Sequence, residues 1–380
     1  MVYEYLSPMN IGFIGGSLNS AVGYTHFNAS RLDGQFRVVC GCFSRHIEQN
    51  QRTASAYGIP QDRIYANWQS LLEKESSNLD AIVILTPTPS HAEIVIAALE
   101  AGYPVICEKS LGVSSEQCGV IRNALHHSGG FLAVTYNYSG YPMIRELRRM
   151  IDEGQLGRIQ QIHIEMPQEG FQRQAANPQA WRCQDYSVPT VSLDLGVHVY
   201  HLVSFLTNGR KPLKVIGEYA SYGQIPGIVD NVYCMTRYSD DLRVQAWWGK
   251  TALGYRNGLR IRVFGSKASA EWYQMEPENL RWSDDDGHHY LLDRGSTEAM
   301  LAKQPRYNRF KAGHPSGFIE AFANLYMDIA NNLRAHKKGV SFVNPFVYGA
   351  ASSEEGLFFL EAVNASADNG VWINLENFRS

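Results

Sequence analysis

Short apolar runs alternate with helical patterns along the first part of the chain. Ala81–Leu85 (AIVIL) is apolar at every position, which is typical of a parallel strand covered on both faces. Helical patterns such as Glu48–Tyr57 and His91–Ala101 separate these runs, and a glycine follows each of the two. The alternation predicts an α/β fold with a doubly wound parallel sheet. The expected strands are Ile11–Ile14, Phe36–Phe43, Ala81–Leu85, Val105–Cys107 and Phe131–Thr135.

The pattern changes after Tyr138, where strand-like runs follow one another. Short polar turns join several of these runs, so we expect an antiparallel sheet. Residues 283–315 are charged and contain glycine, and we expect them to form a long surface loop. We divide the chain into two domains, residues 1–137 and residues 138–380. The expected strands of the second domain include Ile159–Met166, Leu213–Tyr219, Asn231–Tyr238, Leu242–Trp248, Leu259–Phe264 and Ala268–Gln274, and its helices include Leu193–Leu206, Phe318–Leu333 and Tyr348–Ala367.

The composition is that of a globular protein with a large core, because 44% of the residues are hydrophobic and 19% are charged. The net charge of -3 offers no basic surface for nucleic acid or for an anionic membrane. No apolar run is long enough to cross a bilayer, and we expect no signal peptide. The six cysteines are scattered without a zinc spacing, so we expect reduced thiols in a cytoplasmic protein and no bound metal.

The segment Asn10–His26 carries the first candidate chemistry. Its apolar start runs into a glycine-rich turn and then into small residues that end at Gly23. Such a turn between a strand and a helix lets the backbone approach a pyrophosphate. The match to G-x-G-x-x-G is imperfect because Gly23 comes late, and a plain strand–turn–helix explains the segment equally well. The candidate cofactor contacts in the turn are Gly15, Gly16, Ser17, Leu18 and Asn19.

The end of the second expected strand bears on the choice of cofactor. In a dinucleotide fold an Asp or Glu at this place accepts from the ribose 2′-hydroxyl and favours NAD. Here Ser44 and Arg45 follow the strand, with no acid. A serine can hydrogen-bond a phosphate and an arginine can pair with it, so the pair favours NADP over NAD. The alternative is that Arg45 is a solvated residue at the start of a helix.

The third strand is followed by Thr86-Pro87-Thr88-Pro89-Ser90-His91. The two prolines hold the backbone extended at the carboxyl end of the strand, where ligands bind in parallel sheets. We therefore expect Thr86, Pro87 and Thr88 to form a wall of the cofactor pocket. His91 is grouped with them, although a histidine at the start of a helix more often caps or packs.

The next strand delivers Glu108 and Lys109 to the same edge of the sheet. An ammonium at this place could donate to a substrate hydroxyl and help to hold cofactor and substrate together. The alternative is an exposed charge pair at the end of a strand. For a Glu-Lys pair considered by itself, this alternative is the better interpretation.

Asp194 and His198 lie four residues apart in an expected helix and so share one face. A carboxylate and an imidazole that converge on a pocket can relay a proton. The same spacing could bind a metal, but no third ligand is evident. A capping Asp194 beside a packed His198 is an equally good account of the pattern.

Taken together, these pieces resemble the Gfo/Idh/MocA family, the oxidoreductases similar to glucose–fructose oxidoreductase and inositol dehydrogenase. The resemblance covers nearly the whole chain, and the order and spacing of its features are more specific than any one of them. The features are Gly15-Gly16-Ser17 with His26 after Gly23, Thr86-Pro87 to His91, Glu108-Lys109, Gly154-x-x-Gly157 and Asp194-x-Gly196-x-His198.

The resemblance implies a Rossmann domain followed by an α/β domain with a large, mostly antiparallel sheet that often forms a subunit interface, hence a homodimer or homotetramer. It implies an enzyme that transfers hydride between NAD or NADP and a hydroxyl-bearing carbon of a sugar or polyol. Lys109 matches the family's catalytic lysine, and Asp194 and His198 match its acid and histidine. By this likeness His198 takes the hydroxyl proton, Lys109 polarises the oxygen and Asp194 orients the substrate, although the acceptor can be Lys109. Candidate substrate contacts are Tyr138, Trp181, Arg182, Asp194 and His198.

The chain also departs from the family pattern. Ser110 replaces the proline of the family's Glu-Lys-Pro motif, which puts a cis peptide bond there in doubt, and Ser17 replaces a cofactor glycine. Two other functions remain open for this fold: a dinucleotide-binding regulator without turnover, and a glycoside-cleaving enzyme that oxidises its substrate transiently. Lys109 and His198 weigh against the regulator because both are present.

Overall fold

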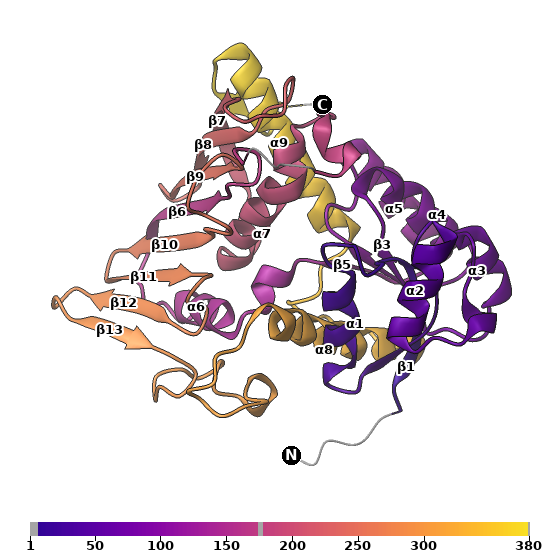
Figure 1. Cartoon of the computed structure of the whole chain (residues 1–380). Helices are drawn as coiled ribbons and strands as arrows, with labels where there is room; N and C mark the ends of the chain where they lie inside the picture. The colour runs from indigo at the N-terminus through magenta and orange to yellow at the C-terminus, as the bar shows by residue number, and fades with distance from the viewer. Residues whose placement is uncertain (1–6, 174–177, 379–380) are drawn as a thin grey trace. The chain divides into compact units, whose positions relative to one another are not determined.

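The computed structural model describes residues 7–173 and 178–378 (Figure 1). The described chain forms two compact units. The first unit contains residues up to 112, residues 116–140 and residues 318–354, and the second contains the remainder. The division into residues 1–137 and 138–380 did not anticipate the return of residues 318–354 to the first unit.

The first unit is built on a five-stranded parallel sheet in the order β2-β1-β3-β4-β5. Every residue of β3 is buried, as its unbroken apolar sequence predicts. Five helices connect or flank these strands. The strands are β1 (Met9–Gly15), β2 (Phe36–Cys42), β3 (Ala81–Leu85), β4 (Val105–Glu108) and β5 (Leu132–Thr135), and the helices are α1 (Gly23–Leu32), α2 (Ile47–Tyr57), α3 (Trp68–Lys74), α4 (His91–Glu100) and α5 (Ser115–Ser128).

Helix α8 (Phe318–Lys337) comes from far along the sequence and completes the core of the first unit. Its buried side chains, among them Phe322 and Tyr326, belong to one hydrophobic cluster with residues of α1, α2 and the sheet. Alternate residues of β3, such as Val83, point into this cluster, so α1, α2 and α8 cover the same face of the sheet.

The second unit is built on a nine-stranded sheet in the order β13-β12-β11-β10-β6-β9-β8-β7-β14. All neighbours are antiparallel except β6 and β9. Helices α6 (Pro142–Asp152), α7 (Val197–Leu206) and α9 (Ala350–Asn369) lie on one side of it (Figure 1). The strands are β6 (Ile159–Pro167), β7 (Pro212–Ala220), β8 (Asn231–Tyr238), β9 (Arg243–Gly249), β10 (Arg260–Gly265), β11 (Ala268–Tyr273), β12 (Leu280–Asp284), β13 (His289–Leu292) and β14 (Ile373–Asn374).

The predicted fold class is confirmed, but the expected surface loop 283–315 is wrong at its start. Strands β12 and β13 form a hairpin there, and the rings of Trp282 and Tyr290 stack across it with centroids 4.9 Å apart. Gly287 adopts a positive φ of 87° in the turn, and Asp284 accepts the backbone N–H of His288. Cross-strand aromatic stacking and a glycine turn thus extend the sheet through a polar segment.

Among the helices of the described chain, none is both long and apolar enough to cross a membrane.

Candidate cofactor and substrate sites

Four neighbouring parallel strands of the first unit end at one edge of the sheet, and the predicted cofactor residues follow those ends. Because parallel strands share a direction, their carboxyl ends meet at a single edge, where ligands bind in open α/β sheets. The structure therefore brings the predicted cofactor segments to one edge. The segments are Gly15–Asn19 after β1, Ser44 and Arg45 after β2, Thr86–Thr88 after β3, and Glu108 and Lys109 around the end of β4.

The glycines of the first turn are required by packing. A Cβ atom added at Gly23 would lie 2.2 Å from the carbonyl oxygen of Gly16, so α1 starts in direct contact with the turn. Gly16 itself adopts a φ of 74°, a conformation that favours glycine. Gly23 comes later than the G-x-G-x-x-G rule expects, yet it provides the close approach of helix and turn that such a glycine provides. The turn and the start of α1 are therefore packed so closely that only glycine fits at Gly23.

Leu18, a predicted cofactor contact, also has contacts within the protein. Its backbone N–H donates to Oγ1 of Thr53 at 3.2 Å. Its side chain packs against the hydrophobic cluster of the first unit. Leu18 thus anchors the turn, while Ser17 and Asn19 on either side of it carry the polar side chains.

Ser44 and Arg45 lie between the end of β2 and the start of α2. Oγ of Ser44 accepts the backbone N–H of His46 at 3.1 Å, and Arg45 is exposed. Arg45 forms no hydrogen bond or ion pair with another described residue, so its guanidinium lies open to solvent at the sheet edge.

His91 joins the exits of β3 and β4. Its Nδ1 lies 2.7 Å from the carbonyl oxygen of Ser110, and its Nε2 lies 2.7 Å from the carbonyl oxygen of Thr86. Burial lowers the pKa of His91, and the two carbonyl contacts oppose that shift. With both ring nitrogens on the backbone, His91 fixes the two loops. The Lys109–Ser110 peptide bond between them is cis, although serine stands in the place of the family's proline.

Glu108 is buried at the end of β4 and belongs to a network of hydrogen bonds. Its Oε1 lies 2.9 Å from Nε2 of His26 and also accepts from the hydroxyl of Thr135. The other nitrogen of His26 lies 2.8 Å from the hydroxyl of Tyr326 on α8. Burial opposes ionisation, but the contacts of His26 and Thr135 and the charge of Lys109 together outweigh it and lower the pKa of Glu108. The network fixes the residue that precedes Lys109. Lys109 itself follows the end of β4 and is half-buried.

The second unit brings Asp194 and Arg182 together and adds Lys250, which the sequence analysis missed. Nε of Arg182 lies 3.2 Å from Oδ2 of Asp194, and Nζ of Lys250 forms an ion pair with the same oxygen. The guanidinium of Arg182 lies over the ring of Trp181, 4.3 Å from its centroid, and Lys250 lies 4.9 Å from that of Phe171. A lysine directly after the aromatic end of a strand, in the run Trp247-Trp248-Gly249-Lys250, was the available signal.

The expected regular helix 193–206 is interrupted. Asp194 lies in a π-helical turn, Ser192–Gly196, and His198 lies in α7, which begins at Val197. π-Helical turns are rare and are frequent at functional sites. His198 is buried within the second unit. Tyr138, in contrast, lies in a buried turn of the first unit.

A parallel α/β unit with a glycine turn at its ligand-binding edge is the architecture of a dinucleotide-binding protein. Comparison with known families makes the assignment specific. Residues 9–136 match the description "Oxidoreductase family, NAD-binding Rossmann fold", and residues 144–271 match "GFO/IDH/MocA C-terminal domain". The chain belongs to the Gfo/Idh/MocA family and is an oxidoreductase, as predicted.

Known proteins match this chain over different lengths, some of them over almost the whole chain. The uncharacterized oxidoreductase YfiI of Bacillus subtilis is 29% identical over 97% of each chain. A levoglucosan dehydrogenase from Pseudarthrobacter phenanthrenivorans is 30% identical over 54% of this chain and 57% of its own. The structure of an inositol dehydrogenase homolog from Azotobacter vinelandii, complexed with NADH and myo-inositol, has a TM-score of 0.86 at 28% identity and covers 97% of this chain and 98% of that one.

Proposed function

We propose that the protein transfers hydride between a nicotinamide cofactor and a hydroxyl-bearing carbon of a sugar, a polyol or a sugar derivative. The observation that carries this proposal is the position of Lys109 directly after β4, at the sheet edge that also holds the glycine turn. The relatives support it, because they include inositol 2-dehydrogenases and a levoglucosan dehydrogenase, and one similar structure holds NADH and myo-inositol.

We assign the dinucleotide to the first unit. Side chains at Gly16 and Gly23 would clash with the packed turn, and the neighbouring Ser17 and Asn19 offer polar groups. When bound, the nicotinamide ring supplies the site that accepts or releases hydride. We assign the pyrophosphate to residues 15–19 and the adenosine ribose to Ser44 and Arg45. Glu108 contributes through its buried network, and we place it behind Lys109 rather than against the cofactor.

The residues of the chain divide the remaining chemistry among them. In the oxidation direction the substrate hydroxyl loses its proton as hydride leaves the same carbon, so a base must accept that proton. We assign this role to His198 or Lys109, with the other polarising the oxygen. Asp194 already contacts Arg182 and Lys250 as an ion pair, so it orients groups and does not accept the proton. Trp181 and Tyr138 complete the proposed substrate contacts.

We propose that NADP is preferred over NAD. This preference is supported by the exposed Arg45 and by the lack of an Asp or Glu in residues 43–46, which connect β2 to α2. Dissociation constants for NADPH and NADH decide it. We expect Arg45→Ala to weaken NADPH about tenfold and NADH little, since one charge-assisted hydrogen bond is worth about 1.5–3 kcal/mol. Equal losses for both cofactors would refute the role.

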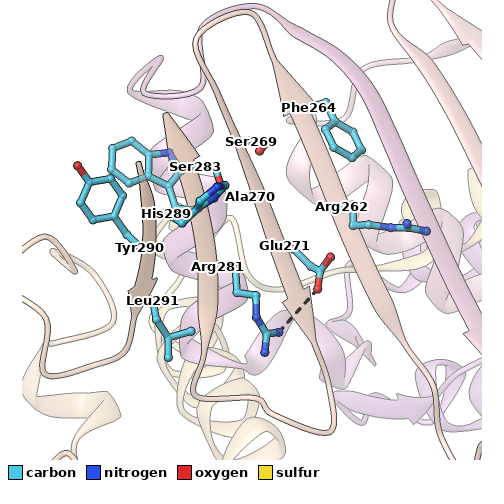
Figure 2. Close-up of a pocket in the computed structure, with 11 residues that line it drawn as sticks. Arg262, Phe264, Ser269, Ala270, Glu271, Arg281, Ser283, His289, Tyr290 and Leu291 are labelled. Carbon is cyan, nitrogen blue, oxygen red and sulfur yellow. Dashed lines mark hydrogen bonds and ion pairs between the residues drawn. The ribbon is translucent and has the colours of Figure 1, made fainter. Parts of the chain in front are cut away.

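We also propose a homodimer or homotetramer assembled through the sheet face that carries no helix. A groove of about 610 Å³ lies over β10–β13, where Arg281 and Glu271 approach to 3.7 Å (Figure 2). Arg262 stands on β10, and its guanidinium lies 4.0 Å from the carboxylate of Glu165 on β6. Both signs of charge on one face suit a second copy turned about a two-fold axis, which sets arginine against glutamate. Analytical ultracentrifugation tests this, and a monomer at micromolar concentration would contradict it.

A reducing compartment such as the cytoplasm remains our expectation. All six cysteines are free thiols in the described chain, and five of them are buried. Fractionation of the native host with an antibody would test the location.

The function itself is tested by absorbance at the reduced-nicotinamide band with a panel of sugars and inositols. We expect turnover with at least one member of the panel and NAD or NADP. Lys109→Ala should reduce kcat by a factor of about 10² or more, which is typical of a lost general acid–base group. Binding of cofactor without turnover on any sugar or polyol would instead favour a regulator, and full activity of Lys109→Ala would remove the lysine from the mechanism.

A further inference from the structure

Gln49 on α2 bridges the two polar side chains of the glycine turn. Its Nε2 donates to Oγ of Ser17 at 3.2 Å, and its Oε1 accepts from Nδ2 of Asn19 at 2.8 Å. Gln49 is half-buried, whereas its neighbour Glu48 is exposed. One amide group therefore contacts both residues that flank Leu18.

The same stripe of α2 holds the rest of the turn. Thr53 and Tyr57 follow Gln49 at intervals of four residues, which places all three on one side of the helix. Thr53 accepts the N–H of Leu18, and the hydroxyl of Tyr57 donates to the carbonyl oxygen of Gly16 at 3.2 Å. The turn is thus fastened to α2 along two helical turns, and α2 starts directly after the segment assigned to the adenosine ribose.

Several backbone donors that a glycine turn usually offers to phosphate already have acceptors here. Oγ of Ser20 lies 3.4 Å from the N–H of Val22 and 3.2 Å from that of Gly23, at the start of α1. The N–H of Leu18 is taken by Thr53. The recognition of a pyrophosphate by this turn must therefore rely more on side chains than in a turn with a complete set of glycines.

The amide of Gln49 determines what those side chains present. A hydroxyl that accepts a hydrogen bond still has its own proton to donate, and Ser17 accepts from Gln49. The amide of Asn19 gives one N–H to Gln49 and keeps a second. Both side chains are thereby set as donors, which is the polarity that a phosphate oxygen requires.

We propose that Gln49 is a positioning residue for the cofactor: it orients Ser17 and Asn19 as hydrogen-bond donors to the pyrophosphate of a dinucleotide. The inference rests on the proposed function, since it assumes that a nicotinamide dinucleotide occupies the edge of the first sheet. It adds a residue outside the glycine turn to the set that recognises the cofactor.

Two substitutions separate orientation from simple support. Gln49→Leu removes the bridge at similar size, and we expect it to weaken NADH about tenfold, the effect of about 1.4 kcal/mol. Gln49→Glu keeps the size but only accepts, so it draws the Ser17 hydroxyl and the Asn19 amide inward and adds a negative charge near the phosphates. We expect it to weaken NADH about 100-fold, and more than Gln49→Leu. Gln51→Leu, at an exposed position of the same helix, is the matched control and should bind as wild type does.

The readouts are the dissociation constants of NADH and of adenosine, measured by fluorescence and calorimetry, and the thermal midpoint of each variant. Adenosine has no phosphate, so its affinity should change less than twofold. In a cycle with Ser17→Ala, the loss caused by Gln49→Leu should be smaller than in wild type, because the hydroxyl that it orients is gone. If Gln49→Leu does not fold, Gln49→Glu carries the same comparison.

The outcomes distinguish this inference from the function on which it rests. NADH affinity that is unchanged in Gln49→Leu, or no weaker in Gln49→Glu than in Gln49→Leu, overturns the role of Gln49. Equal losses for NADH and adenosine also overturn it, because they would reveal a structural support only. A wild-type protein that binds neither NADH nor NADPH refutes the proposed function instead.

Discussion

The Glu108 carboxylate lies 2.9 Å from Nε2 of His26, and both side chains are buried. They come from β4 and α1, and Tyr326 of α8 contacts the other nitrogen of the imidazole. A buried carboxylate that loses its partner retains its desolvation cost without the compensating hydrogen bond.

We therefore expect His26→Ala to lower the free energy of unfolding by about 3 kcal/mol. Urea denaturation followed by circular dichroism measures the change. Tyr24→Ala, on the same helix but exposed, serves as the control and should change stability little. A loss below about 1 kcal/mol in His26→Ala would show that the pair contributes no more than a typical neutral hydrogen bond.

The ion pair between Lys250 and Asp194 leads to a prediction about the substrate site. Lys250→Met keeps the length of the side chain and its contact with Phe171, but it removes the ammonium that pairs with Asp194. We expect kcat/KM for the sugar substrate to fall about tenfold or more, because a charge-assisted hydrogen bond is worth about 1.5–3 kcal/mol. The affinity for NADH should stay unchanged, since Lys250 belongs to the second unit.

Lys267→Met is the matched control, because Lys267 is exposed on the same unit. Steady-state kinetics with the best substrate of the panel gives the comparison. If Lys250→Met and Lys267→Met have the same kcat/KM, the cluster of Arg182, Asp194 and Lys250 has no part in recognising the substrate.

The sequence predicted what local patterns determine and missed what depends on distant contacts. The unbroken apolar run Ala81–Leu85 identified a buried parallel strand with its observed bounds. Nothing local pairs Tyr326 with His26, which lie 300 positions apart and meet only because α8 returns to the first unit. Likewise, Lys250 stands 56 positions from Asp194 and reaches it because β9 ends beside the π-helical turn.

The start of the expected loop 283–315 shows a second kind of limit. Residues 284–289 are polar, which favours a loop, and the apolar run Tyr290-Leu291-Leu292 that follows them is short. The pairing of β12 with β13 depends on Trp282 and Tyr290 stacking across the hairpin, which is a contact between residues that hydropathy does not relate. For the candidate site, the sequence likewise indicated which segments contribute to it. The hydrogen-bond and ion-pair partners of each side chain were seen only in the structure.

His201 on α7 predicts a dependence of stability on pH. Burial lowers its pKa from 6.5 to about 3, with a smaller contribution from the charge of Arg148. Below pH 6.5 the unfolded chain binds a proton that the folded chain does not, so folding stability falls as the pH falls from 6.5 toward 3. The slope from this group is at most about 1.4 kcal/mol per pH unit.

Urea unfolding between pH 7.5 and about 5 measures that slope. His201→Phe keeps an aromatic ring without a titrating nitrogen and should flatten it, whatever its effect on stability at neutral pH. His126→Phe changes an exposed histidine and should leave the slope as in wild type. A slope that is the same in wild type and His201→Phe would contradict a buried, neutral His201.

The contact between α1 and the glycine turn gives the last prediction. A methyl group at Gly23 would meet the backbone of Gly16 at 2.2 Å, and neither backbone segment can yield as a flexible side chain would. Gly23→Ala must therefore displace the turn or the start of α1, at a cost of about 1–3 kcal/mol. Since Ser17 and Asn19 move with the turn, the affinity for NADH should fall more than about tenfold.

Gly170→Ala is the control, because a Cβ atom there meets nothing within 4 Å and should change neither stability nor binding. Wild-type affinity in Gly23→Ala would mean that the pyrophosphate does not bind at this turn.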